Sequence, residues 1–178
     1  METPDIVQKG DPVLRARAHE VPLSDITSPR IRDIIEKMKR ALDGQKDGVA
    51  IAAPQIGESV RIFVISGKVF DLGKEKRDAP SPDMVCINPK IIKTSKKKEW
   101  VPEGCLSVRW WYGQTHRAKQ ATIRAHDEDG NEFTLGGSGL LAQIFQHETD
   151  HLNGILFSDH AKNLKEASGE EKEDVENK

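Results

Sequence analysis

Two histidines four residues apart are the part of this sequence best suited to chemistry. They belong to the run Gln146-His147-Glu148-Thr149-Asp150-His151. In a helix, His147 and His151 project from one face about one turn apart, so both imidazoles can reach the same metal ion. A divalent ion lowers the pKa of a bound water to about 7, and the carboxylate of Glu148 could take the proton and pass it on. The run therefore predicts metal-assisted hydrolysis.

The apolar residues around the two histidines predict the helix that must carry them. Leu140 and Ile144 lie on the same helical stripe as the histidines, which indicates a buried face. We expect a helix of roughly 16 residues, about 24 Å long at 1.5 Å per residue. Ser138 is expected to cap its start and Gly154 its end. The alternative is that the histidines are ordinary packed side chains, and the short motif alone leaves it open.

A catalytic site of this type needs a third protein ligand, and the residues after the helix offer poor choices. The metzincin spacing would place that ligand at Phe157, which cannot bind a metal. His160 is too close to the helix end to return easily. A metallopeptidase would use a downstream glutamate, and the available ones lie in a polar tail: Glu166, Glu170, Glu171 and Glu173.

Upstream, Cys105 is the better third ligand. It stands in Glu103-Gly104-Cys105-Leu106-Ser107, with no second cysteine nearby to suggest a disulfide. Thiolate is a strong ligand for zinc or ferrous iron. The other cysteine, Cys86, lies in the apolar run Met84-Val85-Cys86-Ile87 and is expected to be a small core residue.

Three runs, taken together and in order, resemble the signature motifs of the peptide deformylase family. They are Gly48-Val49-Ala50-Ile51-Ala52-Ala53-Pro54-Gln55, the cysteine run and the histidine run, and the resemblance covers about residues 5 to 160. It implies a metal-dependent hydrolase that removes the N-formyl group from the N-terminal formylmethionine of newly synthesised proteins, releasing formate. One departure is Ala50, where the family usually has a second glycine.

The resemblance also implies a role for each residue of the site. Cys105, His147 and His151 would bind one divalent metal ion per chain. The family implies Fe2+, and Zn2+, Ni2+ or Co2+ could use the same ligands. Glu148 would act as general base and then as general acid. The implied oxyanion donors are the Gln55 amide and the Leu106 N–H, and the implied substrate-binding residues are Gly48, Ala50, Ile51 and Gly104.

The pattern of the remaining chain predicts an α+β fold. Apolar residues at helical spacing predict an amphipathic helix at residues 29–42, and strand signals occur at residues 60–66, 85–87, 91–94, 121–125 and 132–135. Asp129-Gly130-Asn131 is expected to turn between the last two strands. Because the order is helix, strands, then helix, we expect mostly antiparallel sheets packed around the central C-terminal helix that carries the histidine motif.

One catalytic domain is expected over residues 1–166, followed by a disordered charged tail at residues 167–178. The lysines at 96–98 are expected to form a solvated turn. Residues 108–112 contain two tryptophans and the one tyrosine, and could form a wall for a substrate side chain, an interface or core. Arg117 resembles an arginine to which the family gives a supporting role.

Composition excludes some classes of partner. The 178 residues carry a net charge of −2, two cysteines and no apolar run near the ~20 residues of a membrane span. We therefore expect a cytoplasmic monomer that binds neither membrane nor nucleic acid directly. The resemblance implies N-formylmethionyl nascent peptides as partners, with the ribosome near its exit tunnel as a further one. A metal-binding family member without turnover is the second alternative, favoured by Ala50 and the aromatic loop.

Overall fold

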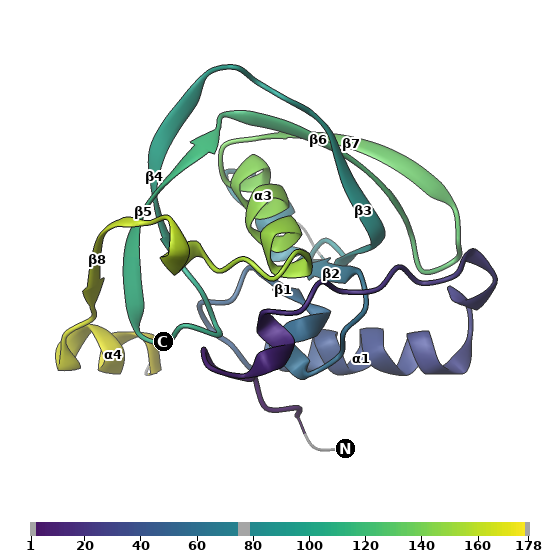
Figure 1. Cartoon of the computed structure of the whole chain (residues 1–178), viewed down its shortest axis with the longest axis horizontal. Helices are drawn as coiled ribbons and strands as arrows, with labels where there is room; N and C mark the ends of the chain where they lie inside the picture. The colour runs from purple at the N-terminus through teal and green to yellow at the C-terminus, as the bar shows by residue number, and fades with distance from the viewer. Residues whose placement is uncertain (1–2, 75–78, 177–178) are drawn as a thin grey trace.

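Two antiparallel sheets surround one helix in the computed structural model, which describes residues 3–74 and 79–176 (Figure 1). The five-stranded sheet has the order β1 (Ala50–Ala52), β2 (Ile62–Ile65), β3 (Met84–Thr94), β6 (Gln120–His126) and β7 (Glu132–Ser138). The three-stranded sheet has the order β4 (Lys98–Gly104), β5 (Trp111–Ala118) and β8 (Lys162–Glu166). The helices are α1 (Pro29–Asp43), α2 (Lys68–Asp71), α3 (Leu140–Leu152) and α4 (Gly169–Glu176). The predicted α+β fold is confirmed.

Helix α3 runs through the space that the strands enclose, as Figure 1 shows. Its buried side chains Ile144 and Phe145 pack with Phe63 of β2 and Ile123 of β6 in one cluster. Burying an isoleucine or phenylalanine side chain fully contributes about 1.5–3 kcal/mol. The position of the two histidines on this helix is therefore fixed by the core. In the described part of the chain, no helix has both the length and the apolar character to cross a membrane.

The end of α3 is where the sequence predicts it, and the start is not. Gly154 follows the C-cap Asn153 with a φ of 76°, and a Cβ there would lie 2.3 Å from the carbonyl oxygen of Arg15. Glycine is required by both facts, so the predicted cap is confirmed. The N-cap is Gly139 without a side-chain cap, and Ser138 ends β7. The predicted serine cap is wrong because the chain passes almost directly from strand to helix.

Helix α1 confirms the prediction for residues 29–42. Ser28 caps it, with its Oγ accepting from the Ile31 N–H at 3.4 Å. The apolar face of α1 packs on Ile51 and Val64, whereas α3 packs in the cluster that holds the alternate residues of the same two strands. Strand β1 is thus buried on both faces, but it is the edge strand of its sheet.

The strands differ from prediction at several places. Residues 85–87 and 91–94 belong to one strand, β3, in which Asn88 has a φ of 50° and the register with β6 shifts twice. The Asn88 conformation and the first shift, between Ile87 and Lys90, surround Pro89, which cannot donate to a strand ladder. The predicted strands at 60–66, 121–125 and 132–135 correspond to β2, β6 and β7, with shifted ends. Strands β1, β4, β5 and β8 are not predicted by the sequence.

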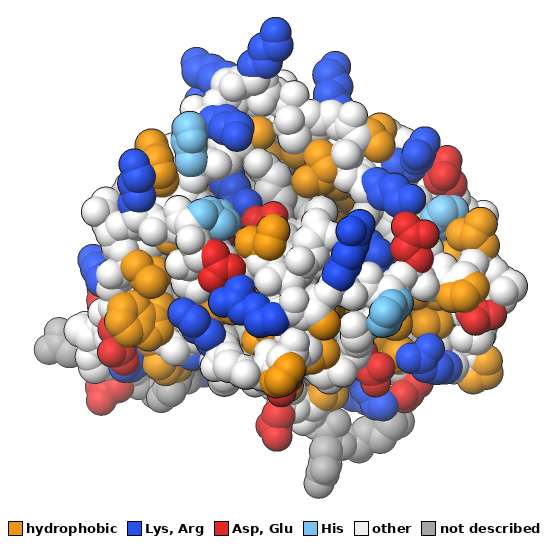
Figure 2. Space-filling view, viewed as in Figure 1, with side chains coloured by type: hydrophobic (Ala, Val, Ile, Leu, Met, Phe, Trp, Pro, Cys, Tyr) orange, Lys and Arg blue, Asp and Glu red, His pale blue; other side chains and the backbone are white. Residues whose placement is uncertain are grey.

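The chain end and the lysine run are both at the surface. The tail predicted to be disordered contains α4, at whose start Ser168 and Glu171 exchange hydrogen bonds of 2.7 and 3.3 Å. Residues 177–178 of that tail lie outside the described residues. Lys96, Lys97 and Lys98 are exposed where β3 leads into β4, and Figure 2 shows Lys and Arg side chains gathered along this upper edge. This agrees with a solvated turn.

A buried arginine holds the end of α3. Arg61 is 7% exposed and donates from Nη1 to the Leu152 carbonyl oxygen and to Asn153 Oδ1, both at 3.0 Å. We expect Arg61→Met to lower the free energy of unfolding by about 2–3 kcal/mol, because charge-assisted bonds to the helix end are lost. Urea unfolding with chelator present measures this, with the exposed Arg30→Met as control. A loss below about 0.5 kcal/mol would contradict the role.

Candidate active site

Three side chains that can bind metal converge between α3 and the end of β4. Cys105 follows β4, and His147 and His151 lie one turn apart on α3. The Cys105 Sγ lies 3.2 Å from the His151 Nε2, and ligand atoms of all three residues lie within 4.8 Å of one another. Atoms that share one ion at bond lengths of about 2.0–2.3 Å must lie about this close. The structure thus brings the upstream cysteine to the histidines.

The downstream alternatives lie elsewhere. Glu166 is exposed on β8 and pairs with Lys172 at 2.7 Å. Phe157 is buried with its ring centroid 6.4 Å from that of His147. Neither Glu166 nor His160 belongs to the group of possible metal ligands found in the described part of the chain. Among the residues that the structure describes, no side chain downstream of α3 therefore joins the two histidines as a third ligand.

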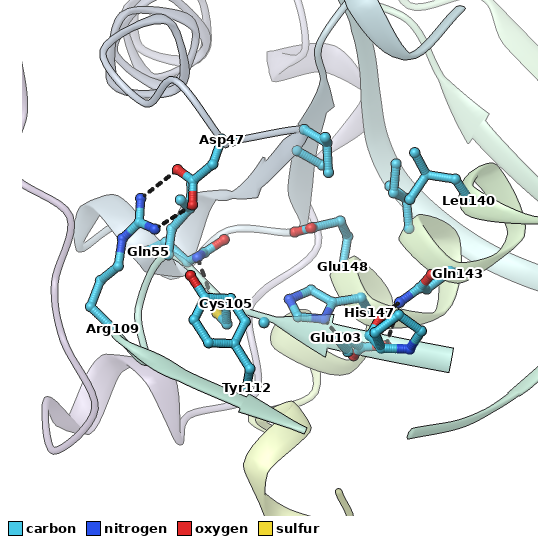
Figure 3. A pocket seen from close by; sticks show the side chains of 17 residues that line it. Asp47, Gln55, Glu103, Cys105, Arg109, Tyr112, Leu140, Gln143, His147 and Glu148 are labelled. Atoms are coloured by element: carbon cyan, nitrogen blue, oxygen red, sulfur yellow. Dashed lines mark hydrogen bonds and ion pairs between the residues drawn. The ribbon is translucent and has the colours of Figure 1, made fainter. Parts of the chain in front are cut away.

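A pocket of about 300 Å³ is lined by Cys105 and His147, two of the three residues (Figure 3). Residues 48–50, at the start of β1, form one wall, and residues 102–104 of β4 form another. Leu140 and Ile144 of α3 complete it. Because β1 and β4 are edge strands of different sheets, their main chains can offer hydrogen bonds to an extended peptide lying between them.

Glu148 projects toward this pocket from α3, as Figure 3 shows. It is 3% exposed, and its Oε2 has no hydrogen-bond partner among the described residues. Burial raises the pKa of Glu148 to about 7, although the neighbouring His147 acts in the opposite direction. A buried carboxyl oxygen that accepts no hydrogen bond from a described side chain or main-chain group is free to accept one from a bound ligand or water. A pKa near neutrality suits a group that accepts a proton and then returns it.

The side-chain amide of Gln55 is held in one orientation. Its Oε1 accepts from the Ala52 N–H at 2.8 Å, while its Nε2 donates to Ser107 Oγ at 3.2 Å and lies 3.7 Å from Cys105 Sγ. Gln55 is 1% exposed and lines the pocket, as does Leu106. A fixed N–H donor beside the Cys105 thiol can stabilise negative charge that develops on an oxygen.

The predicted substrate-binding residues divide into two groups. Gly48, Ala50 and Gly104 line the pocket, whereas the side chain of Ile51 is buried in the core on the α1 side. Ala50 is not among the residues with positive φ, so its methyl group causes no backbone strain in β1. A Cβ on Gly104 would lie 2.7 Å from the ring of Tyr112, so a side chain there would require that ring to move.

The aromatic residues of the 108–112 segment have different positions: Tyr112 lies in the pocket wall and Trp111 lies at the surface. Tyr112 packs over Gly104 and lines the pocket. Trp111 is half-exposed, and Trp110 lies under the guanidinium of Arg109 at 4.8 Å. The sequence left open whether these aromatic residues form a wall for a substrate side chain, an interface or core packing. The structure places Tyr112 in the wall of the pocket.

Glu103 is the residue of this site whose role the sequence does not reveal. Its buried carboxylate accepts from Thr115 Oγ1 at 2.7 Å, from Arg117 Nε at 3.1 Å and Nη2 at 2.5 Å, and from Gln143 Nε2 at 3.1 Å. His147 Nδ1 lies 2.7 Å from the same carboxylate. Burial alone would raise the pKa of Glu103, but the bonds from His147 and Arg117 outweigh it and hold that pKa well below its ordinary value. Glu103 therefore stays ionised and orients His147 with Nε2 toward the cysteine side.

Arg117 joins this network to the histidine helix. Its Nη1 donates to Asp150 Oδ2 at 2.6 Å, so one guanidinium bridges β4, β5 and α3. The sequence contains Glu103 and Asp150 within the two motifs, each two residues from a possible ligand or closer. Their closeness in sequence to the possible metal ligands is the signal by which Glu103 and Asp150 could have been identified. The convergence of donors on Glu103 depends on strand pairing, which the sequence does not show.

The residues present fit a divalent metal ion. One thiolate and two imidazoles form a donor set used by zinc and ferrous iron. Two observations support the fit independently: the carboxylate behind His147 is of the kind that orients metal-binding histidines, and Glu148 Oε2 is buried without a partner. The geometry can therefore support hydrolysis of a small carbonyl group.

Comparisons with known proteins agree with this chemistry. A sequence model of the family described as polypeptide deformylase matches residues 3–167. The chain is 38% identical over 155 residues to the peptide deformylase of Thermomicrobium roseum, covering 86% of this chain and 83% of that protein.

Two solved structures are similar to the fold as well as to the sequence. A peptide deformylase from Synechococcus elongatus in complex with actinonin matches with a TM-score of 0.77 and 38% identity, over 90% of this chain and 81% of that one. A class I type b peptide deformylase from Acinetobacter baumannii, bound to Met-Ala-Ser, matches with a TM-score of 0.77 and 30% identity, over 90% and 100%. The similarity extends over nearly the whole chain in both cases.

Proposed function

The chain belongs to the polypeptide deformylase family, and we propose that it carries out the family's reaction with Cys105, His147 and His151 as metal ligands and Glu148 as the proton-transfer group. The protein removes the N-formyl group from newly synthesised peptides. The proposed roles rest on one observation. Two members of the Cys/His/His group, Cys105 and His147, line one pocket together with Glu148, whose buried Oε2 has no partner among the described residues.

The ion that we propose is Fe2+, one per chain, with Zn2+, Ni2+ or Co2+ able to use the same ligands. Thiolate and imidazole bind all of these ions, so the donor set supports the class of metal. When bound, the ion would supply Lewis acidity, which makes water more acidic and polarises a carbonyl group. Metal analysis of protein purified without oxygen tests the identity, and zinc in place of iron in such protein would contradict it.

The chain's own residues would position the formyl group and move protons. The Gln55 Nε2 and the Leu106 N–H would donate to the formyl oxygen as it gains negative charge, and one such donor contributes about 3–4 kcal/mol in other hydrolases. Glu148 Oε2 would accept a proton from the attacking water and deliver it to the departing amine. Both steps use the one carboxyl oxygen that is buried without a hydrogen-bond partner within residues 3–74 and 79–176.

The substrate peptide would lie between the two strand edges. Main-chain groups of residues 48–50 and of Gly104 would pair with it, and Leu140 and Ile144 would contact the methionine side chain. The relative from Acinetobacter baumannii holds a Met-Ala-Ser peptide, which supports binding of a short peptide by this fold.

We propose that this activity takes place in the cytoplasm, in a monomer, on N-formylmethionyl nascent peptides near the ribosome exit tunnel. The proposal is supported by the substrate, because a nascent amino terminus becomes available as it leaves the tunnel. Residues 1–166 would form the catalytic unit, and the family match to residues 3–167 supports that boundary. Co-sedimentation with translating ribosomes and light scattering test the partner and the oligomeric state.

Product analysis with formyl-Met-Ala-Ser tests the proposed reaction. We expect equimolar formate and intact Met-Ala-Ser, and no release of formate or acetate from acetyl-Met-Ala-Ser, which differs by one methyl group. Cleavage of an internal peptide bond would indicate a metallopeptidase instead. Bound metal without formate would indicate a member of the family without turnover.

We expect Glu103→Gln to lower metal affinity by about 10- to 100-fold, because an uncharged amide orients His147 less well and cannot accept every bond from Arg117. Competition with a fluorescent chelator measures the affinity. Glu99→Gln is the matched control, since Glu99 lies on the same strand and pairs with Lys119 at the surface. An unchanged affinity in a folded Glu103→Gln protein would contradict the orienting role.

A further inference from the structure

An ion pair crosses from one side of the pocket rim to the other. Asp47 precedes β1, and Arg109 lies in the loop between β4 and β5. Arg109 Nη1 lies 2.5 Å from Asp47 Oδ2, Nη2 lies 2.8 Å from Oδ1, and Nη2 also donates to Gln45 Oε1 at 2.8 Å. Figure 3 shows the pair across the pocket from Leu140 and Gln143.

The two partners are fixed more firmly than most surface ion pairs. Their side chains are 18% and 31% exposed, and the geometry is bidentate, which is the strong form of an arginine–carboxylate pair. The Arg109 guanidinium also lies over the ring of Trp110. Its hydrogen bond lowers the pKa of Asp47, so the pair stays charged at neutral pH. The pair can therefore hold the loop that carries Asp47 and the loop that carries Arg109 at a fixed distance from each other.

The position of the pair matters because the pocket is bounded by two unpaired strand edges. Adjacent strands lie about 4.8 Å apart, so a peptide that pairs with both edges needs them separated by about twice that distance. Hydrogen bonds weaken over a few tenths of an ångström, so the spacing must be held. At the inner end the Gln55–Ser107 bond links the two sides, and at the outer end the Asp47–Arg109 pair does so.

We propose that Asp47 and Arg109 are positioning residues that hold the strand edges at the spacing required by substrate residues beyond the first. The inference rests on the proposed function. Neither side chain reaches the reacting atoms by this account, so the pair acts on binding of the peptide rather than on the chemical step. Its effect must grow with the length of the peptide, because only a longer peptide spans the outer part of the rim.

A double-mutant cycle with two substrates tests the proposal. The variants are Asp47→Asn, Arg109→Met and the double variant, and the substrates are formyl-Met amide and formyl-Met-Ala-Ser. We expect each single variant to raise the ratio of KM for the tripeptide to KM for the amide by about five- to tenfold, and the double variant to add nothing further. Asp43→Asn, which removes an exposed charge four residues earlier, should leave the ratio unchanged.

Several results would overturn the proposal. An unchanged ratio in the single variants would do so, and so would independent effects that multiply in the double variant. An equal rise in KM for both substrates, together with a lower melting temperature of the variant, would indicate a merely structural role. Calorimetry of Met-Ala-Ser binding provides a readout that does not depend on turnover. We expect each single variant to bind this product about five- to tenfold more weakly, which is the size of the interaction energy typical of two residues in contact.

The failure of the proposed function would be distinguishable. In that case wild-type protein with bound metal would release no formate from either substrate, whatever happens at residues 47 and 109. If wild type nevertheless bound Met-Ala-Ser, weaker binding by the variants would still support the spacing role. Equal affinity of the wild type and the variants for Met-Ala-Ser would overturn the spacing role. The absence of Met-Ala-Ser binding by all of them would also overturn it.

Discussion

Glu148→Ala should lower formate release from formyl-Met-Ala-Ser by about a thousandfold or more while one metal ion per chain stays bound. General acid–base catalysis contributes about 10²–10⁴ in rate, and here one carboxyl would serve both proton transfers. The carboxyl is not one of the three converging ligands, so the ion should remain. Steady-state kinetics and metal analysis on the same sample measure both quantities.

Two further variants complete the Glu148 experiment. Glu148→Gln keeps the size of the side chain but cannot exchange a proton in this range, so it should lose as much activity as the alanine variant. Glu36→Ala removes an exposed carboxylate from α1 and should stay within about twofold of wild type. If Glu148→Ala retained more than about a tenth of the rate with its metal in place, the acid–base role would be wrong.

Cys105→Ala should remove the metal ion and formate release together. Mutating an outer hydrogen-bond partner of a metal ligand costs about 10- to 100-fold in affinity, so loss of a ligand should cost more than about a hundredfold. Cys105→Ser should weaken binding and shift metal preference, because a hydroxyl is a harder and poorer ligand than a thiolate. Metal content after dialysis against a weak chelator, measured with activity, checks both variants.

The chain supplies its own control for this experiment in Cys86. That thiol is fully buried in the core cluster with Phe63 and Phe145, and burial raises its pKa far above the ordinary value. Cys86→Ala should therefore keep its metal and its activity while losing about 1 kcal/mol of stability. Equal metal loss in the two alanine variants would contradict the assignment of Cys105.

The sequence predicts the helical parts of the fold well because their signals are local. Helix α1 carries its apolar stripe, its cap and its proline within 16 consecutive residues, from Ser28 to Asp43. Helix α3 also shows an apolar stripe, and Gly154, which the sequence already marks as a stop, follows its C-cap where a side chain would clash with Arg15. The start of α3 is mispredicted because Gly139, with a φ of 56°, replaces the usual side-chain cap.

The second sheet is missed for a physical reason that concerns the site. The inward residues of β4 and β5 include Glu103, Thr115 and Arg117, which are buried as an ionic and hydrogen-bonded network. Polar residues on the inner face hide the alternation of apolar and polar residues by which strands are recognised. Local rules are expected to fail at functional sites, and these strands are an example.

The site itself could be predicted only in part. The spacing of His147 and His151 is local, but Cys105 lies more than 40 residues earlier, so only its residue type and the weakness of the downstream candidates favour it as the third ligand. The role of Glu103 and the Asp47–Arg109 pair could not be foreseen, because both depend on contacts between segments distant in sequence. Strand β1 is too short, at three residues, to be recognised by pattern.

The most direct test is formate release from a short formyl-Met peptide as a function of bound metal, using protein prepared without oxygen. Metal-free protein is loaded stepwise with Fe2+, and metal content and rate are measured on each sample. We predict a rate proportional to occupancy that reaches its plateau at one ion per chain and is absent in Glu148→Ala at full occupancy. Formate release by metal-free protein, or full occupancy without formate in wild type, would contradict the account.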